Sequence, residues 1–193
     1  IDGTELGFSQ EFGSHDYRNT VVTAGAATER FGARVSASML STENDRSNDA
    51  YEREFVNARF DYQITDVLFL EWISQYTYAE KELPGSTAAP TANHLQKTAD
   101  WIISPGIMYA TDELSIHAFY ARSESNVDNN NAGAQNDLIV ETDEVHVQAD
   151  YSAADTLLVS TGATYRREDA YNSNVAFFGP PVAYEEAFEQ LGI

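Results

Sequence analysis

Apolar and polar residues alternate at every second position along most of the chain. Three stretches show this most clearly: residues 31–39, 56–64 and 145–151. In the first of them the apolar positions are Phe31, Ala33, Val35, Ala37 and Met39. A period of two is typical of β-strands that have one apolar face. The pattern predicts nine strands and the start of a tenth, over residues 4–13, 16–28, 30–42, 54–65, 67–80, 100–111, 113–125, 141–154, 156–170 and from 186 onward.

The connections between the predicted strands are short at one end and mostly long at the other. Tight turns follow the second, fourth, sixth and eighth strands, at Glu29-Arg30, Asp66, Asp112 and Asp155. Aspartate suits such turns because it tolerates turn dihedrals and hydrogen-bonds its own backbone. The other connections are long and polar, apart from the short Gly13-Ser14-His15. This asymmetry predicts an antiparallel sheet in which each strand pairs with the next one along the chain.

A single sheet with one apolar face needs something to cover that face. The sequence offers no amphipathic helices for this purpose, and no run of about 18 apolar residues that would form a transmembrane helix. Tyrosines also gather at two levels of the apolar faces, which is typical of the two interfaces of a bilayer. They are Tyr62, Tyr109 and Tyr151 near the short turns, and Tyr76, Tyr78, Tyr120 and Tyr165 near the other end. The predicted fold class is therefore all-β, an antiparallel up-and-down transmembrane β-barrel with lipid outside.

Composition excludes several classes of function. The chain has 31 acidic against 11 basic residues, a net charge of -20, so a polyanionic nucleic acid would be repelled. It contains no cysteine, which excludes disulfides, thiolate metal sites and a cysteine nucleophile. Neither a G-x-S-x-G turn nor a G-x-G-x-x-G loop is present, and we expect no enzymatic activity.

Five segments together resemble a known family. They are FGSHDYRNT (12–20), ERFGARVSASMLSTENDR (29–46), ARFDYQITDVLFLEWISQYTYAEKELPG (58–85), DWIISPGIMYATDELSIHAFYARSE (100–124) and DEVHVQADYSAADTLLVSTGATYRRED (143–169). They are similar to the early barrel strands of TonB-dependent outer-membrane receptors, and closest in character to vitamin B12 and siderophore receptors. The resemblance implies a barrel of about 22 strands around an N-terminal plug domain. Residues 1–193 are then expected to be a partial β-barrel domain, with the plug and the remaining strands not present in it.

The resemblance also implies a function. It predicts a receptor in the outer membrane of a Gram-negative bacterium, which takes up a scarce solute such as a siderophore or cobalamin. Its expected partners are the lipid bilayer, a small-molecule ligand, and TonB through the missing N-terminal part. The ligand is expected to contact the long loops 41–54, 81–99, 123–140 and 168–183. Two alternatives remain: a passive porin or small complete barrel with a structural role, and a water-soluble lipocalin-like protein.

Candidate site residues fall into two groups. The loop from 43 to 52 holds closely spaced carboxylates and amides, and calcium accepts such oxygens. Asp45, Asp49 and Glu52 are therefore predicted calcium ligands, although the spacing is not that of an EF-hand and a solvated loop without metal is the alternative. The second group consists of polar side chains expected on the inner face of the barrel, towards the plug or the water-filled interior. These are Arg34, Arg59, Glu71, His117, His146 and Asp150.

Overall fold

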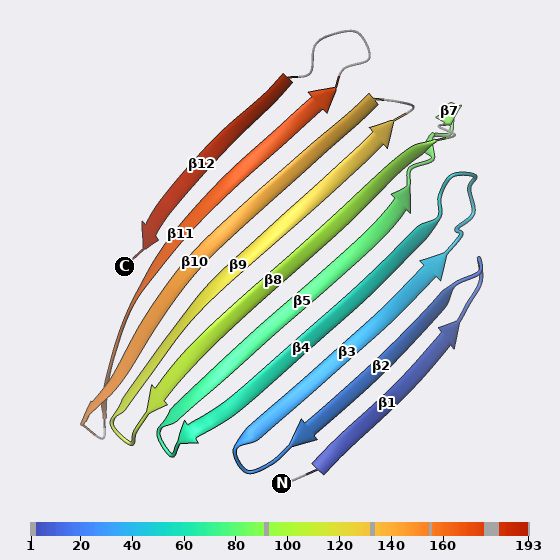
Figure 1. Ribbon diagram of the computed structural model, residues 1–193. Coiled ribbons are helices and arrows are strands. Elements are labelled where there is room, and N and C mark those ends of the chain that lie inside the picture. Colours follow the sequence, from blue (N-terminus) through green and yellow to red (C-terminus); the bar gives the residue numbers. More distant parts are fainter. Residues whose placement is uncertain (1–2, 91–92, 132–133, 155, 176–181, 193) are drawn as a thin grey trace.

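The computed structural model describes residues 3–90, 93–131, 134–154, 156–175 and 182–192. These residues form one ten-stranded antiparallel sheet whose strands lie in sequence order, interrupted only by a small separate hairpin (Figure 1). The sheet strands are β1 (Gly3–Phe12), β2 (Arg18–Ala27), β3 (Phe31–Thr42), β4 (Tyr51–Thr65), β5 (Leu68–Glu82), β8 (His94–Ala110), β9 (Leu114–Asn131), β10 (Ala134–Ala154), β11 (Leu157–Val175) and β12 (Val182–Gly192). The hairpin consists of β6 (Gly85–Ser86) and β7 (Ala89–Pro90). The predicted up-and-down order is confirmed.

Three of the short turns contain a threonine whose hydroxyl accepts a hydrogen bond from the turn backbone. The backbone N–H of Phe31 donates to Thr28 Oγ1 at 3.1 Å, and that of Leu114 donates to Thr111 Oγ1 at 3.0 Å. Between β4 and β5, the N–H of Val67 donates to Thr65 Oγ1 at 3.3 Å. These side chains hold the turn backbone in the way expected of short hydroxyl residues. The predicted turn at Asp155 lies outside the described residues.

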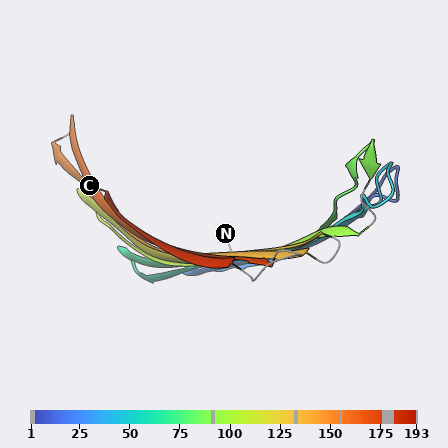
Figure 2. The ribbon, with the colours of Figure 1, turned by 90° about the horizontal axis from the view of Figure 1, so that it is seen from above.

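The sheet is curved into a trough (Figure 2). Along β4 the even-numbered apolar residues are more exposed than most of their odd-numbered neighbours, so they occupy the convex side. Phe60 and Tyr62 on this side are 40% and 49% exposed. No hydrophobic side chain in the described part of the chain is buried, and the sheet has no second layer. An apolar convex surface on a single curved sheet is the arrangement of a barrel wall that faces lipid.

Four neighbouring strands are much longer than a bilayer requires. Strands β8, β9, β10 and β11 contain 17, 18, 21 and 19 residues, whereas a tilted strand crosses a bilayer with about 9–11. The loop prediction for 123–140 is therefore wrong, because paired strands occupy the described residues of this range. The ranges 81–99 and 168–183 are also largely strand where the structure describes them. The alternation of apolar residues stops at the end of the apolar band, but backbone pairing continues beyond it.

The convex face changes character beyond the apolar band. Arg122 lies on this face and contacts Glu141 at 3.1 Å and Asp143 at 3.7 Å on the neighbouring strand. Further along, Lys97 pairs with Glu80 at 2.8 Å. The predicted apolar face is thus apolar only within the apolar band, and it carries ion pairs beyond that band. We call this outer set of ion pairs the ionic belt.

The ionic belt also contains tyrosines. Tyr78 donates a hydrogen bond to Glu80, and Tyr120 donates one to Asp143. Hydrogen bonds from Lys97 and Tyr78 lower the pKa of the Glu80 carboxyl, which lies beyond the apolar band. These two tyrosines therefore lie at the border between the apolar band and the ionic belt. Tyrosines gather at the corresponding level of a membrane interface. The described residues contain no helix that is long and apolar enough to span a membrane.

Candidate binding face and outer loops

The polar side chains predicted to face inward do share one face. The register pairs Arg34 with Arg59 across β3 and β4, and Asp61 with Glu71 across β4 and β5. It then carries the same face through Gly106 on β8 to β9 and β10. On those two strands His117, His146 and Asp150 occupy positions of this face. The prediction that these side chains share one face is confirmed, and this face is the concave side of the sheet.

Two carboxylates on the concave face reach across a whole strand. Glu71 on β5 lies over Gly106 on β8, and its Oε1 contacts Nε2 of His117 on β9 at 2.7 Å. A Cβ atom at position 106 would lie only 2.8 Å from Glu71 Cγ, so the absence of a side chain there permits this path. Glycine within a strand often marks such a close approach.

The same arrangement occurs at the other end of the sheet. Glu5 on β1 lies over Gly25 on β2 and contacts Nε of Arg34 on β3 at 3.5 Å. A Cβ atom at position 25 would lie 2.9 Å from Glu5 Cγ. We call these two contacts, Glu5–Arg34 and Glu71–His117, the strand-skipping pairs. Because each glutamate side chain lies across the neighbouring glycine, it projects little from the concave face.

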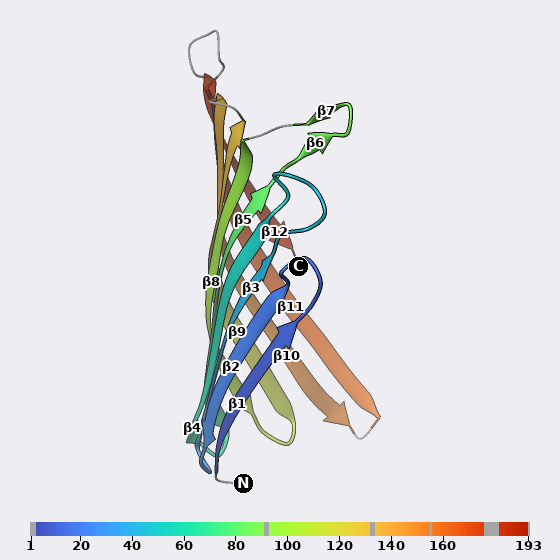
Figure 3. The same ribbon diagram turned by 90° about the vertical axis from the view of Figure 1, so that its right-hand side faces the viewer.

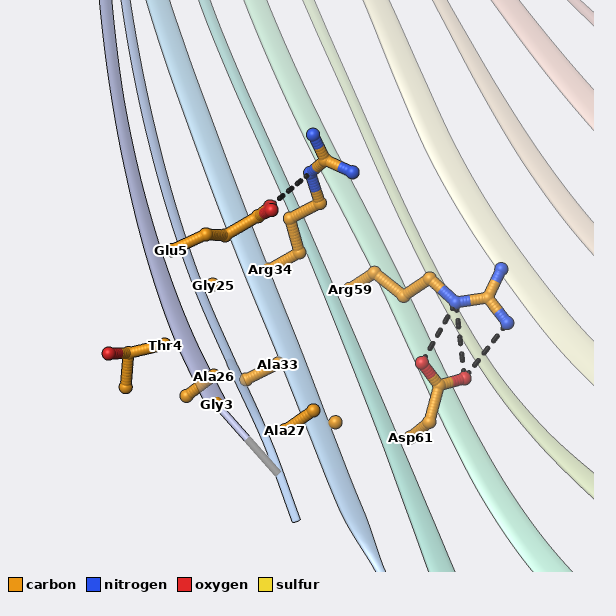
Figure 4. A pocket seen from close by; sticks show the side chains of 11 residues that line it. Gly3, Thr4, Glu5, Gly25, Ala26, Ala27, Ala33, Arg34, Arg59 and Asp61 are labelled. Carbon is orange, nitrogen blue, oxygen red and sulfur yellow. Dashed lines mark hydrogen bonds and ion pairs between the residues drawn. The ribbon is translucent and has the colours of Figure 1, made fainter. Parts of the chain in front are cut away.

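Arg59 forms the densest ionic contact of the concave face. Its Nε donates to Asp61 Oδ2 at 3.0 Å and its second guanidinium nitrogen donates to Asp61 Oδ1 at 2.8 Å. The same guanidinium lies 3.7 Å from Glu71, which connects it to one strand-skipping pair. Figure 4 shows Arg59–Asp61 and Glu5–Arg34 next to the glycines and alanines with which they line a hollow. The charges there are paired with one another, as expected for a water-filled interior or a docked partner.

The two histidines of the concave face, His117 and His146, have separate partners. The ring of Phe119 lies between them, with its centroid 5.8 Å from His117 and 5.1 Å from His146. Each histidine has a different polar partner: Glu71 for His117, and Thr164 Oγ1 at 2.8 Å for His146. Each histidine is therefore held in the wall by its own polar partner.

At the end opposite the short turns, three consecutive connections contact one another. Asn48 Nδ2 donates to the carbonyls of Leu83 at 3.0 Å and His94 at 3.3 Å, at the base of the β6–β7 hairpin. Arg46 donates to the carbonyl of Gly85 at 2.9 Å. The backbone N–H of Glu43 in turn donates to the carbonyl of His15, in the first connection, at 2.8 Å. These loops turn towards the concave side of the sheet (Figure 3).

The three predicted calcium ligands each have different surroundings. Asp45 contacts Nδ1 of His15 at 3.2 Å, and the Asp49 carbonyl accepts a hydrogen bond from Asn44 at 2.6 Å. Glu52 lies on β4 at a position of the convex face, directly opposite Glu80. Among the described residues no three His, Asp or Glu side chains are grouped as a metal site. Calcium binding therefore stays a prediction.

Comparisons with known proteins identify the fold. No family model and no curated protein matches the sequence. Among solved structures, the siderophore receptor PiuA from Acinetobacter baumannii matches with a TM-score of 0.71 and 14% identity, covering 93% of this chain and 33% of that one. BauA, the ferric preacinetobactin receptor from the same organism, matches with a TM-score of 0.73 and 15% identity over 95% of this chain and 34% of that one.

The chain has the fold of an outer-membrane receptor barrel wall. The copper transporter OprC gives the same picture, with a TM-score of 0.70, 11% identity, and coverage of 90% of this chain and 29% of that chain. This chain thus spans about a third of the length of the structures it matches. The names of these neighbours describe receptors and a transporter, and none describes an enzyme.

Proposed function

We propose that these residues form part of the barrel of a TonB-dependent outer-membrane receptor that takes up a scarce small solute. One observation carries the proposal: a single curved sheet, with strands in sequence order, presents an apolar face on its convex side and charged residues on its concave side. That combination suits a wall between lipid and a polar interior. The similarity of fold to siderophore and copper receptors supports the proposal.

The parts of the wall then have separate roles. The interlocked outer loops, which turn towards the interior, first contact the solute. The concave face with its paired charges surrounds a plug domain, for which the flat strand-skipping pairs leave room. TonB, acting through segments outside this chain, moves the plug with energy from the inner membrane. The long loops or strand ends nearest the solute differ between receptors, and they set which solute is taken up.

Ferric siderophore chelates are the first solutes to test, because one neighbour is named as a siderophore receptor and another as a ferric preacinetobactin receptor. Copper and cobalamin come next. The experiment uses the full-length protein, expressed in a Gram-negative strain without its own siderophore receptors. Uptake of radioactive iron from a panel of chelates is measured with and without TonB.

Two results would contradict the proposal. Uptake that continues without TonB would show passive diffusion, which is the porin alternative. A protein that stays in solution without detergent would show that the apolar convex face does not meet lipid.

A further inference from the structure

A second hollow lies on the concave face, farther from the short turns than the charged region around Arg59. Two successive rows of paired residues across β5, β8, β9 and β10 form its floor. The first row is Gln75, Ile102, Ser123 and Thr142, and the second includes Asp100, Ser125 and Val140. Because residue 75 follows Glu71 and Ile73 at intervals of two, this floor is on the same face as the strand-skipping pairs.

The chemistry of the floor is one-sided. Asp100 is the charged residue of the two rows, and Glu124 also lines the hollow, from a convex-face position. Ser125 Oγ donates to Asp100 Oδ1 at 2.6 Å, which fixes the carboxylate in place. Neither lysine nor arginine lines the hollow. The nearest bases on the two central strands, Lys97 and Arg122, occupy convex-face positions and pair with carboxylates of the ionic belt. Asp100 therefore has no basic partner among the residues that form this hollow.

Three apolar residues also line the hollow: Ile102 and Val140 from the concave face, and Trp101 from a convex-face position. Ile102 and Val140 come from the two rows, next to the hydroxyls of Ser123 and Thr142. A carboxylate and hydroxyls accept hydrogen bonds from N–H and O–H groups, and a protonated amine is favoured over an anion. The apolar pair favours a carbon-rich portion beside these donors.

We infer that this hollow is a subsite for the transported solute, and that it selects a neutral or positively charged organic solute with N–H or O–H donors beside an apolar portion. The inference rests on the proposed function, because the hollow can meet a solute only if the concave face lines its path. It goes further in naming the charge of the solute. It also places the contact on paired strands, including Ser123, Ser125 and Val140 of the range 123–140 that was expected to be a loop.

The test compares two probes on the purified full-length receptor. One is the ferric complex of a linear trihydroxamate with a free terminal amine, which is positively charged. The other is a ferric tricatecholate, which is negatively charged. Affinities are measured by quenching of intrinsic tryptophan fluorescence, for the unchanged receptor and for Asp100→Asn. We expect the unchanged receptor to bind the trihydroxamate more tightly, and Asp100→Asn to weaken that binding about tenfold, the loss of one charge-assisted hydrogen bond.

Two further variants keep the result interpretable. Asp100→Glu retains the charge and should retain most of the affinity for the trihydroxamate, which a general loss of structure would not allow. Glu141→Gln removes a carboxylate on the convex face of the neighbouring strand β10 and should leave both affinities unchanged. Tighter binding of the tricatecholate, or equal trihydroxamate binding by Asp100→Asn, would overturn the inference while TonB-dependent uptake stands. If neither probe nor any other chelate is bound or taken up, the proposed function fails and the subsite with it.

Discussion

The substitution Gly106→Ala tests the physical basis of the concave face. Gly106 is buried under Glu71, and a methyl group there would lie 2.7 Å from Glu71 Oε1 and 2.8 Å from its Cγ. The conflict with Cγ is not relieved by rotating the carboxylate alone, so the whole side chain must move. Its 2.7 Å contact with His117 then breaks.

The expected magnitude follows from three contributions. Overpacking of this kind costs about 1–3 kcal/mol. The lost contact adds about 1 kcal/mol at most, because the side chains of Glu71 and His117 are 27% and 39% exposed and water screens them. Replacing glycine returns about 0.4–1 kcal/mol, since the unfolded chain loses freedom. We therefore expect a net loss of about 1–3 kcal/mol in the free energy of unfolding.

Urea-induced unfolding of the full-length protein in lipid vesicles measures this change. Gly3→Ala is the matched control, because a Cβ atom there meets no atom within 4 Å. In the double variant Glu71→Ala with Gly106→Ala the methyl group has room, so we expect Gly106→Ala to cost almost nothing in that background. Additive effects of the two substitutions would refute the reasoning, because residues in contact should couple.

Three further predictions concern the lipid face, the loops and calcium. Val147→Arg on the convex face should cost about 2–4 kcal/mol in the free energy of unfolding near the middle of the bilayer, measured by the same assay. Gln148→Arg on the concave face should cost less than about 1 kcal/mol. Equal costs would contradict the assignment of the two faces. Asn48→Ala removes two donors to backbone carbonyls and should speed protease cleavage near the β6–β7 hairpin without changing cleavage in the sheet. If calcium binds the loop, calorimetric titration of the full-length protein should show a site that Asp45→Asn weakens at least tenfold; an unchanged isotherm would remove Asp45 from the ligand set.

The sheet order and the assignment of faces were predictable from sequence because both follow from residue types at a period of two. Turn residues such as Asp66 and Asp112 also marked the end where the connections are short. The predicted long loop 123–140 failed for a physical reason. Beyond the lipid both faces of a strand meet water, so Asn and Asp residues there show no alternation although their backbones are paired.

The finer parts of the candidate site needed coordinates. The sequence predicted that Glu71 and His117 face inward, but not that they touch across β8, because it does not fix the register of three strands. Glycine at an inward position of a predicted strand, as at Gly106, is a usable signal for such an approach. Asp100 was missed although it lies in a predicted strand, because its position opposite Ser125 depends on the register between β8 and β9, which the sequence does not fix.

The strand-skipping pairs have a consequence for how this sequence can evolve. Positions 71, 106 and 117 come from three different strands, and positions 5, 25 and 34 form a second such set. A larger residue at position 25 or 106 is compatible with the fold only when the acid across from it becomes short. Substitutions at the three positions of each set are therefore coupled. The outer two positions of a set lie on strands that are separated by one strand. Among homologous sequences, covariation of the outer two positions should vanish wherever the middle glycine is lost.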